Sequence, residues 1–340
     1  MTDISRMQDT VTALAASGKG ILAADESSPT MAKRLAAVDV ESTEENRRFY
    51  RSLLVTTPDI ERYISGVIFF EETLGQRTGD GTAIPDACTQ RGVVPGVKVD
   101  KGTIALAGSP EDKITEGLDG LAGRLETYLE QGARFTKWRN VYRIATHQPS
   151  TQAVEANAEV LARYAAIVQA AGMVPIVEPE VLIDGDHDMD RCAAVTEWVQ
   201  SAVYAALRRH RVTLELTVLK PNMVMPGKER PKQSPEAVAD HTVRVLRRSV
   251  PAAVPTINFL SGGQTPEEAT ANLNAMNAAY PDLPWQLSFS YGRALQEPAL
   301  QAWRGDAANA GAAQKAFLNR ARLNAAAREG GYRADMENVA

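Results

Sequence analysis

An α/β fold, closed into a single (β/α)8 TIM barrel, is the fold class that the 340-residue sequence predicts. Two observations lead to it. Short apolar runs alternate with amphipathic helix patterns about every 30–45 residues, the spacing of βα units. Almost every run also ends in a charged or hydroxylated residue. In a barrel these ends meet around one mouth, whereas an open doubly wound sheet would spread them along a line too long to serve one substrate.

The predicted strands are eight runs rich in Val, Ile and Leu, an arrangement typical of parallel strands buried on both faces. In chain order they are GILAAD (20–25), ISGVIFFEE (64–72), VVPGVKVD (93–100), RFTKWR (134–139), MVPIVEPE (173–180), LELTVLK (214–220), PTINFLS (255–261) and QLSFSYGR (286–293).

Helix signals occupy the segments between these runs. Ser42 with Glu45 predicts a capping box before an amphipathic segment. Thr265 followed by Pro266 predicts another helix start. Gly172 predicts a helix end directly before the run at 173–180.

Composition narrows the class of protein. A net charge of -5 argues against general attraction to nucleic acid or to an anionic membrane. No segment approaches the roughly 18 apolar residues that span a bilayer, and the N-terminus lacks a signal-peptide pattern. Two cysteines without metal or redox spacing favour a reducing compartment. We therefore expect a cytoplasmic protein with one domain over 1–340, an N-terminal helix at about 1–17 and a short tail at about 330–340.

Two pairs of charged residues lie near the ends of neighbouring predicted strands. Lys137 and Arg139 share one face of their strand because alternate residues point the same way, and Glu178 and Glu180 do the same on the next strand. Two cations and two carboxylates at one barrel mouth could form a structural ion-pair lattice or serve catalysis. The pairs alone do not decide between these alternatives.

Lys220 is the most informative of the strand-end residues. It ends an apolar run and precedes Pro221, which stops the strand. Free lysine, with a pKa of about 10.4, is too protonated at neutral pH to attack a carbonyl. Desolvation and a neighbouring cation such as Lys137 would favour the neutral, nucleophilic amine. The commoner alternative for a single lysine is a side chain that extends to solvent.

Two regions have the composition of phosphate sites. FLSGG (259–263) and SYGR (290–293) follow the last two predicted strands, where barrels often bind phosphate through backbone N–H groups. A second basic group comes from Lys98, Arg34 and Arg139. We expect a small-molecule substrate phosphorylated at both ends.

No metal or cofactor is predicted. The segment DGDHD (184–188) superficially resembles a metal-binding loop, but it contains a single histidine and is more typical of a surface turn. The chain has four histidines, and no two have ligand spacing on one helix.

Several stretches together resemble a known family. GKGILAADES, EENRRFYR, KVDKG, KWR, PIVEPE, LKPNMV, FLSGGQ and SYGRAL are similar to signature stretches of the class I fructose-1,6-bisphosphate aldolases, in the same order, from residue 18 to about residue 296. The resemblance implies a metal-independent lyase of glycolysis and gluconeogenesis. Such an enzyme reversibly cleaves fructose 1,6-bisphosphate to dihydroxyacetone phosphate and glyceraldehyde 3-phosphate through a lysine Schiff base. It also implies a homo-oligomer, commonly a tetramer.

The resemblance assigns roles residue by residue. Lys220 matches the Schiff-base lysine and Glu178 the acid–base residue that helps water leave. Asp25 matches the residue that takes part in deprotonating the C4 hydroxyl. Lys137 matches the cation that tunes the site, with Glu180 as its partner. The residues that match the C1-phosphate site are Ser261, Gly262, Ser290, Gly292 and Arg293. Those that match the C6-phosphate side are Ser27, Arg34, Lys98 and Arg139.

This chain departs from the family pattern in two places. After ADES it continues with Ser28, Pro29 and Thr30, where we expect Ser28 to cap a helix that starts at Pro29. The resemblance also implies a longer tail with a terminal tyrosine, whereas Tyr332 is the last tyrosine here. Two other functions stay open: another Schiff-base sugar-phosphate aldolase or transaldolase, and a non-catalytic binding scaffold.

Overall fold

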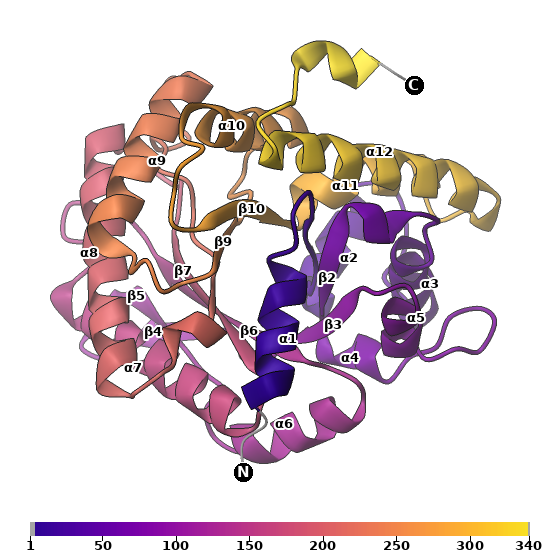
Figure 1. The fold of residues 1–340 in the computed structure, drawn as a ribbon, viewed down its shortest axis with the longest axis horizontal. Coiled ribbons are helices and arrows are strands. Elements are labelled where there is room, and N and C mark those ends of the chain that lie inside the picture. The colour runs from indigo at the N-terminus through magenta and orange to yellow at the C-terminus, as the bar shows by residue number, and fades with distance from the viewer. Residues whose placement is uncertain (1–3, 339–340) are drawn as a thin grey trace.

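The computed structural model describes residues 4–338 and forms a closed barrel of parallel strands surrounded by helices (Figure 1). Around the barrel the order is β1-β10-β9-β8-β7-β6-β3-β2. These strands are β1 (Gly20–Ala24), β2 (Ile64–Phe69), β3 (Val94–Lys98), β6 (Phe135–Tyr142), β7 (Val174–Val181), β8 (Val218–Leu219), β9 (Thr256–Phe259) and β10 (Gln286–Tyr291). The predicted barrel is confirmed, and each predicted run overlaps one of its strands, although β6 and β7 continue past the ends of their runs, to Tyr142 and Val181.

One predicted strand is much shorter than its run. Leu214–Leu216 forms a 3-10 turn, in which Thr217 Oγ1 donates to the Leu214 carbonyl at 2.7 Å, so only Val218–Leu219 is strand. The hydrogen bonding continues one residue further, because the Lys220 N–H donates to the Val177 carbonyl at 2.9 Å. Lys220 is therefore still held by the barrel backbone.

Helices connect the strands and cover the outside of the barrel. They are α1 (Ile4–Leu14), α2 (Ser28–Ala36), α3 (Glu44–Val55), α4 (Glu71–Leu74), α5 (Ile84–Gln90), α6 (Leu121–Glu130), α7 (Thr151–Ala170), α8 (Met189–Arg209), α9 (Pro235–Ser249), α10 (Pro266–Ala279), α11 (Arg293–Trp303) and α12 (Ala310–Arg328). Helix α1 lies within the predicted N-terminal helix, whose residues 1–3 are outside the described part of the chain.

The predicted helix ends are partly right. The capping box at Thr265 is confirmed, and Gly172 follows α7 with a φ of 74°. The predicted N-cap of α3, Ser42, lies one residue too early. Thr43 is the residue whose side chain accepts the hydrogen bond from the Asn46 N–H. The cap of α2 is likewise Ser27, since Ser28 already belongs to the helix. Where two serine or threonine residues are adjacent, either can cap the helix, so the sequence alone does not show which of the two is the N-cap.

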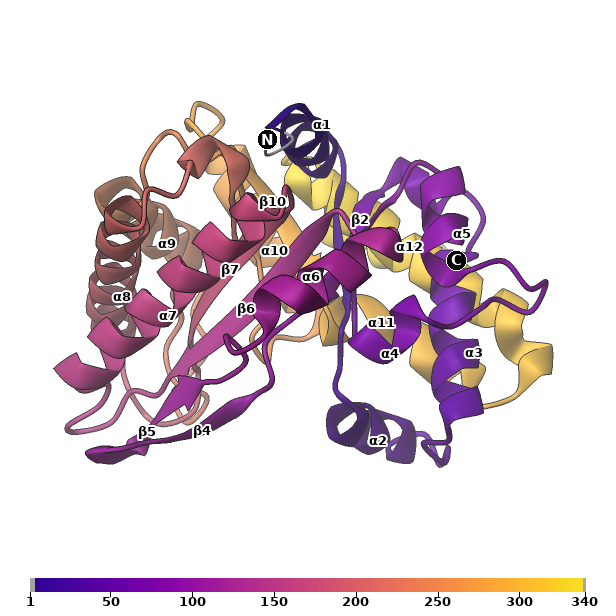
Figure 2. The ribbon, with the colours of Figure 1, turned by 90° about the horizontal axis from the view of Figure 1, so that it is seen from below.

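The barrel interior is filled by side chains and closed at one end by α1. Phe135 lies against Gly96 of the neighbouring strand, where an added Cβ would come within 2.4 Å of the ring. Met7, Val11 and Leu14 of α1 pack on the interior cluster from below. Figure 2 shows α1 at one end of the barrel and the β4–β5 hairpin at the other. With its amino end closed, the barrel can admit a ligand only at its carboxyl end.

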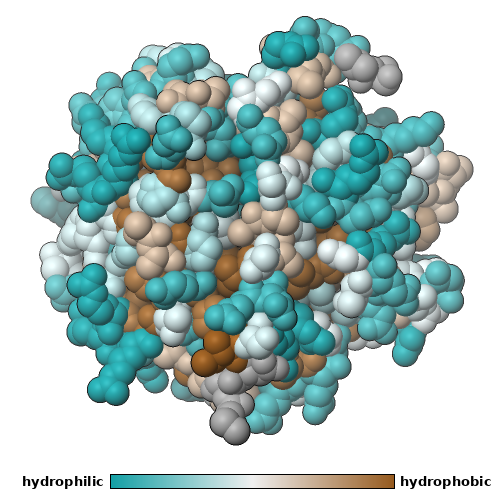
Figure 3. Space-filling view, viewed as in Figure 1, coloured by the Kyte–Doolittle hydropathy of each residue, from teal (hydrophilic) through white to brown (hydrophobic). Residues whose placement is uncertain are grey.

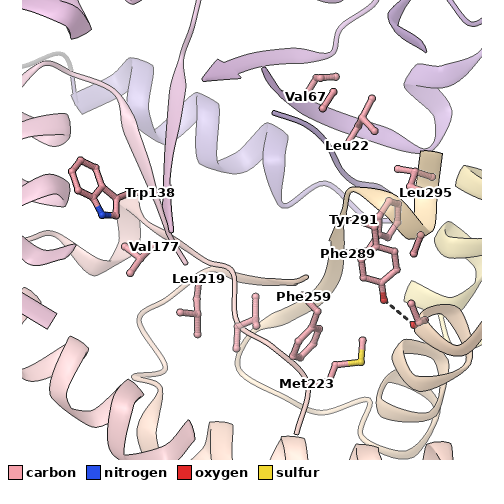
Figure 4. Close-up of a cluster of buried hydrophobic side chains, with 14 of the residues drawn as sticks. Leu22, Val67, Trp138, Val177, Leu219, Met223, Phe259, Phe289, Tyr291 and Leu295 are labelled. Carbon is pink, nitrogen blue, oxygen red and sulfur yellow. Dashed lines mark hydrogen bonds between the residues drawn. The ribbon is translucent and has the colours of Figure 1, made fainter. Parts of the chain in front are cut away.

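A second layer of core lies between the strands and the helices. Trp138, Val177 and Leu219 belong to it, and Figure 4 shows these side chains on neighbouring strands. The Trp138 ring lies 5.3 Å from the Tyr164 ring of α7. As predicted, Trp138 thus points away from the face that carries Lys137. This packing fixes the strands from which the charged side chains project.

One feature at the carboxyl end of the barrel was not predicted from the sequence. A hairpin of β4 (Thr103–Leu106) and β5 (Ser109–Thr115) follows β3. The short runs TIAL and SPEDKIT around Gly108 were its sequence signal. Thr115 Oγ1 ties the hairpin to the Arg139 carbonyl at 2.9 Å.

The predicted C-terminal tail is held against the helices as far as residue 338, and residues 339–340 lie outside the described part. Buried Arg320 of α12 donates to both carboxylate oxygens of Glu337, at 3.0 and 2.8 Å. The Tyr332 hydroxyl donates to the same carboxylate at 2.8 Å. Over residues 4–338, no helix is both long and apolar enough to span a membrane.

Candidate active site

A cavity of about 740 Å³ opens at the carboxyl ends of the barrel strands. Strand ends and the loops that follow them supply its walls, because in a parallel barrel all of these ends face the same side. Among the residues that line it are Asp25, Ser27, Arg34, Lys98, Lys137, Arg139, Glu178, Glu180, Lys220, Ser261, Gly262, Ser290, Gly292 and Arg293. The fold therefore brings every residue proposed from the sequence into one cavity.

A larger hollow, of about 1080 Å³, lies at the opposite end beside α1. Figure 3 shows apolar side chains gathered near the middle of this face. Its lining is mainly apolar or amide in character, with Met7, Val11 and Gln169 as examples. No lysine lies beside a carboxylate in its lining, as Lys137 and Lys220 do in the mouth cavity. The larger volume therefore does not make this hollow the candidate active site.

Three charged groups, two of them buried and the third, Asp25, 13% exposed, form the floor of the mouth cavity. Lys137 Nζ lies 2.7 Å from Asp25 Oδ2 and 3.1 Å from Glu178 Oε2. The Lys137 and Glu178 side chains are each 4% exposed, so little water screens these contacts. They come from three strands, β6, β7 and the end of β1, which the barrel brings together.

These contacts shift the acidity of two of the groups. Burial by itself raises the pKa of the Asp25 carboxyl, but Lys137 and Lys220 together hold it well below its ordinary value. Burial lowers the pKa of the Lys137 ammonium, yet Asp25 and Glu178 outweigh that effect and raise it. Asp25 is thus an anion and Lys137 a cation at neutral pH.

Lys220 stands beside this group. Its Nζ lies 3.4 Å from Glu178 Oε1, and the side chain is 4% exposed. The alternative of a lysine that extends to solvent is therefore wrong. Glu178 Oε2 is buried and accepts no hydrogen bond of ordinary geometry from the described residues. A buried carboxyl that lies between two amines, those of Lys137 and Lys220, can hold or release a proton there.

One wall of the cavity carries cations that already have carboxylate partners. Lys98 Nζ lies 2.5 Å from Asp100 Oδ1, and Arg139 Nε lies 2.5 Å from Glu180 Oε2. Burial lowers the pKa of Arg139, but Glu180 and the other nearby carboxylates raise it overall. An arriving phosphate must share these cations with their present partners.

The opposite wall has unpaired donors. Gly262 and Gly263 have φ values of 49° and 83°, which gives the turn after β9 a concave backbone. Ser290 Oγ is buried and finds no partner among the described residues. Arg293, at the start of α11, donates to the Gln264 carbonyl at 3.2 Å. Backbone N–H groups, a free hydroxyl and a guanidinium at a helix start form an anion site.

One contact differs from what the resemblance implied. Glu180 pairs with Arg139 and not with Lys137, because both residues lie further along their strands toward the mouth. Arg34 Nη2 lies 3.6 Å from the position that a Cβ on Gly292 would occupy. Arg34 therefore lies close to Gly292, and both line the cavity. Thr30 lines the cavity, with its hydroxyl 3.1 Å from that of Ser27.

Four charged residues that line the cavity were not among the predicted site residues, namely Glu26, Glu71, Asp100 and Lys101. Asp100 and Lys101 stand in the motif KVDKG and Glu26 in ADES, so the signal was present. Their partners could not be seen, because each contacts a residue brought near by folding. Between residues 4 and 338, no group of three or more His, Cys, Asp or Glu side chains could hold a metal ion.

A buried amine that can add to a carbonyl, with a proton-transferring carboxyl at its side and anion-binding walls above it, defines a lysine-dependent lyase of sugar phosphates. Comparison with known proteins supports this class of enzyme and identifies the family. A family model described as fructose-bisphosphate aldolase class-I matches residues 6–340, and the chain belongs to this family. It is thus a lyase that reversibly cleaves fructose 1,6-bisphosphate through a lysine Schiff base.

Relatives match over nearly the whole chain. Cytosolic fructose-bisphosphate aldolase 6 of Arabidopsis thaliana is 57% identical over 318 residues, which is 94% of this chain and 89% of that protein. Fructose-bisphosphate aldolase C of Rattus norvegicus is 54% identical, over 96% of this chain and 90% of its own. The solved Plasmodium falciparum fructose-bisphosphate aldolase, in complex with TRAP and a small-molecule inhibitor, superposes with a TM-score of 0.95 at 46% identity, covering 97% and 96% of the two chains.

Proposed function

We propose that Lys220 is the Schiff-base nucleophile of this aldolase. Its amine adds to the C2 carbonyl of the open-chain bisphosphate, and loss of water leaves an iminium. The positive nitrogen withdraws electrons from the C3–C4 bond, so cleavage leaves a neutral enamine on the lysine. The observation that carries this proposal is the burial of Lys220 with its Nζ 3.4 Å from Glu178.

Glu178 acts as the acid–base residue in this scheme. Its carboxyl gives a proton to the carbinolamine hydroxyl, which leaves as water, and it takes a proton back when the product imine is hydrolysed. Lys137 stands between Glu178 and Asp25 and stabilises whichever of the two is ionised. A cation that contacts both carboxylates lets one of them change protonation without leaving a buried charge alone.

Asp25 takes part in removing the proton from the C4 hydroxyl as the C3–C4 bond breaks. Since its lowered pKa keeps it ionised at neutral pH, it is in the form that accepts a proton. Glyceraldehyde 3-phosphate then leaves. Protonation of the enamine and hydrolysis of the imine release dihydroxyacetone phosphate.

The phosphates orient the substrate across the cavity. Ser261, Gly262, Ser290, Gly292 and Arg293 form the C1-phosphate site, and Ser27, Arg34, Lys98 and Arg139 bind the C6 phosphate. The free Ser290 hydroxyl and the backbone turn support the first assignment. The surface position of Lys98 and Arg139 on the other wall supports the second.

Trapping of the Schiff base tests this assignment. Borohydride reduction in the presence of dihydroxyacetone phosphate should leave a stable adduct on Lys220, identified by peptide mass mapping, and activity should persist in EDTA. Lys220→Met should form no adduct. Lys228→Met, which alters an exposed lysine outside the cavity lining, is the matched control. An adduct on another lysine, or a Lys220→Met variant as active as the parent, would exclude the proposed mechanism.

Two broader properties belong to the same proposal. The chain is one domain and a cytoplasmic homo-oligomer, a tetramer by family resemblance. The cytosolic and cytoplasmic names of its relatives support the location. Sedimentation equilibrium over a range of concentrations measures the oligomeric state, and a monomer at micromolar concentration would contradict it.

A further inference from the structure

The strand that leads to Lys220 is the shortest in the barrel. Strand β8 consists of Val218 and Leu219, and its register with β9 is a single pair, Leu219 with Ile257. Within residues 4–338, the last backbone hydrogen bond that joins this segment to β7 is donated by the Lys220 N–H, to the Val177 carbonyl at 2.9 Å. Backbone pairing with β7 therefore stops at the residue on which the chemistry depends.

Two prolines prevent the ladder between β7 and β8 from continuing. The register pairs Val177 with Leu219, so its next step would bring Pro179 of β7 opposite Pro221. In a parallel pair each strand must donate N–H groups to the other, and a proline has none. Without another contact, nothing would fix the distance between β7 and the chain after Lys220.

The side chain of Asn222 supplies that contact. Its Oδ1 accepts from the Val181 N–H at the end of β7, at 3.0 Å. Its Nδ2 donates to the Met223 carbonyl at 3.1 Å and to Thr196 Oγ1 of α8 at 3.3 Å. Asn222 is 3% exposed, so water does not compete for these bonds. The amide therefore holds the segment after Lys220 against both β7 and α8.

This contact is close to the reacting groups in sequence but lies outside the cavity. Asn222 is two residues after Lys220, and Val181 is three residues after Glu178. Lys220 and Glu178 line the cavity, whereas Asn222 and Val181 are absent from its lining. The amide thus joins the two chain segments whose side chains bring Lys220 Nζ to 3.4 Å from Glu178 Oε1.

We propose that Asn222 is a positioning residue for the Schiff-base lysine. Its amide replaces the backbone ladder that the prolines interrupt, and so holds Lys220 Nζ beside Glu178. This inference rests on the proposed function, because it uses the roles assigned there to Lys220 and Glu178. Asn222 does not line the cavity, so it acts only through the position of the strand end.

The expected effect is on the covalent step and not on binding. Formation and dehydration of the carbinolamine need Lys220 and Glu178 at the right separation, and a displacement of about 1 Å can slow such a step on the order of 100-fold. Within residues 4–338, Asn222 makes no hydrogen bond to the residues assigned to either phosphate site. Substrate affinity should therefore be kept.

The test measures the two properties separately in Asn222→Leu, which keeps the side-chain volume but leaves the Val181 N–H unpaired. The initial rate at which borohydride traps dihydroxyacetone phosphate on Lys220 should fall on the order of 10- to 100-fold, and kcat should fall with it. Hexitol 1,6-bisphosphate carries both phosphates and no carbonyl. Its inhibition constant should stay within about twofold of the parent value.

Two matched variants distinguish positioning from a general loss of stability. Asn324 is another buried asparagine, and its Oδ1 accepts from Thr270 Oγ1 at 2.6 Å, between α12 and α10. Asn324→Leu should destabilise the fold and keep the parental trapping rate. Thr196→Val removes the longest of the three bonds to Asn222 but leaves the one to Val181, so its trapping rate should stay within about threefold of the parent.

Other results would overturn the inference. A parental trapping rate in folded Asn222→Leu, or an equal fall in Asn324→Leu, would show that Asn222 only supports the fold. An equal fall in Thr196→Val would assign the effect to α8 and not to β7. A raised inhibition constant with normal trapping would connect Asn222 to phosphate binding instead.

Two further arrangements keep the test decisive. If Asn222→Leu does not fold, Asn222→Ser, whose side chain is one bond shorter, replaces it and is judged by the same two measurements. The parent is trapped first. An adduct on a lysine other than Lys220 would contradict the proposed function itself, whereas a parental adduct on Lys220 with unchanged trapping in the Asn222 variant would contradict this inference alone.

Discussion

Replacing Lys137 by methionine should destabilise the protein strongly, because this lysine is the cation shared by two buried carboxylates. Its Nζ lies 2.7 Å from Asp25 and 3.1 Å from Glu178. Methionine has a similar volume, so the packing is kept and the charge is lost. Breaking a buried pair by removing one partner costs about 3–5 kcal/mol. We expect the lower end, about 3 kcal/mol, because Asp25 is 13% exposed and Lys220 still faces Glu178.

Urea unfolding at neutral pH, followed by circular dichroism, measures the effect. The matched control is Lys101→Met, which removes another lysine of the cavity mouth. Lys101 Nζ also lies 2.7 Å from a carboxylate, that of Glu71, but the two side chains are 44% and 40% exposed. An exposed pair contributes at most about 1 kcal/mol, so this variant should unfold near the parent's midpoint. Equal losses in both variants would refute the argument, since burial would then make no difference.

The pH dependence gives a second check on the same reasoning. The pKa of Asp25 in the folded protein is lowered, and Lys137 contributes more to this than any other charge. The ionised Asp25 carboxylate therefore stabilises the fold above its unfolded pKa of about 4, and this stabilisation is lost as the pH falls below that value. Lys137→Met lacks that contribution at every pH. The difference in stability between parent and variant should therefore be largest at neutral pH and shrink below about pH 4. A difference that grew on acidification would have the wrong sign.

Three further variants test other parts of the structure. Gly96→Ala places a Cβ within 2.4 Å of the Phe135 ring, so overpacking should cost about 1–3 kcal/mol in urea unfolding, and a stabilised variant would contradict the packing described for the barrel interior. Thr265→Ala removes a capping box far from the chemistry and should cost about 1 kcal/mol with kcat and KM unchanged; altered kinetics would show that α10 affects the site. Deletion of residues 331–340 leaves buried Arg320 without its carboxylate partner and should lower the thermal midpoint. Hydrogen exchange at C3 of dihydroxyacetone phosphate should change little on this deletion, and a large loss would mean that the tail assists protonation of the enamine.

Local pattern was sufficient for the strands and for the residues that end them. Each apolar run overlaps a barrel strand because a parallel strand buried on both faces is mostly apolar along its length. The run at 214–220 shows the limit of this reasoning. Its first half has the same composition as a strand but closes a 3-10 turn, and composition does not distinguish the two.

The contacts between charged residues show a second limit. Alternation along β6 and β7 predicts that Lys137 and Arg139 enter the mouth with Glu178 and Glu180, but it does not say which cation meets which carboxylate. The structure pairs Arg139 with Glu180 and leaves Lys137 to Glu178 and Asp25. That choice depends on how deep each side chain lies, which follows from the stagger of neighbouring strands.

By itself, the sequence determined the eightfold alternation of strand and helix, the polar residues at the strand ends and the family to which they belong, because these follow from periodicity and from motifs along the chain. Tertiary structure alone decided that Lys220 is buried beside Glu178 and that Arg34 lies next to Gly292, held by Glu26. Burial and charge pairing depend on distances between segments far apart in the sequence, and these distances exist only once the barrel has closed.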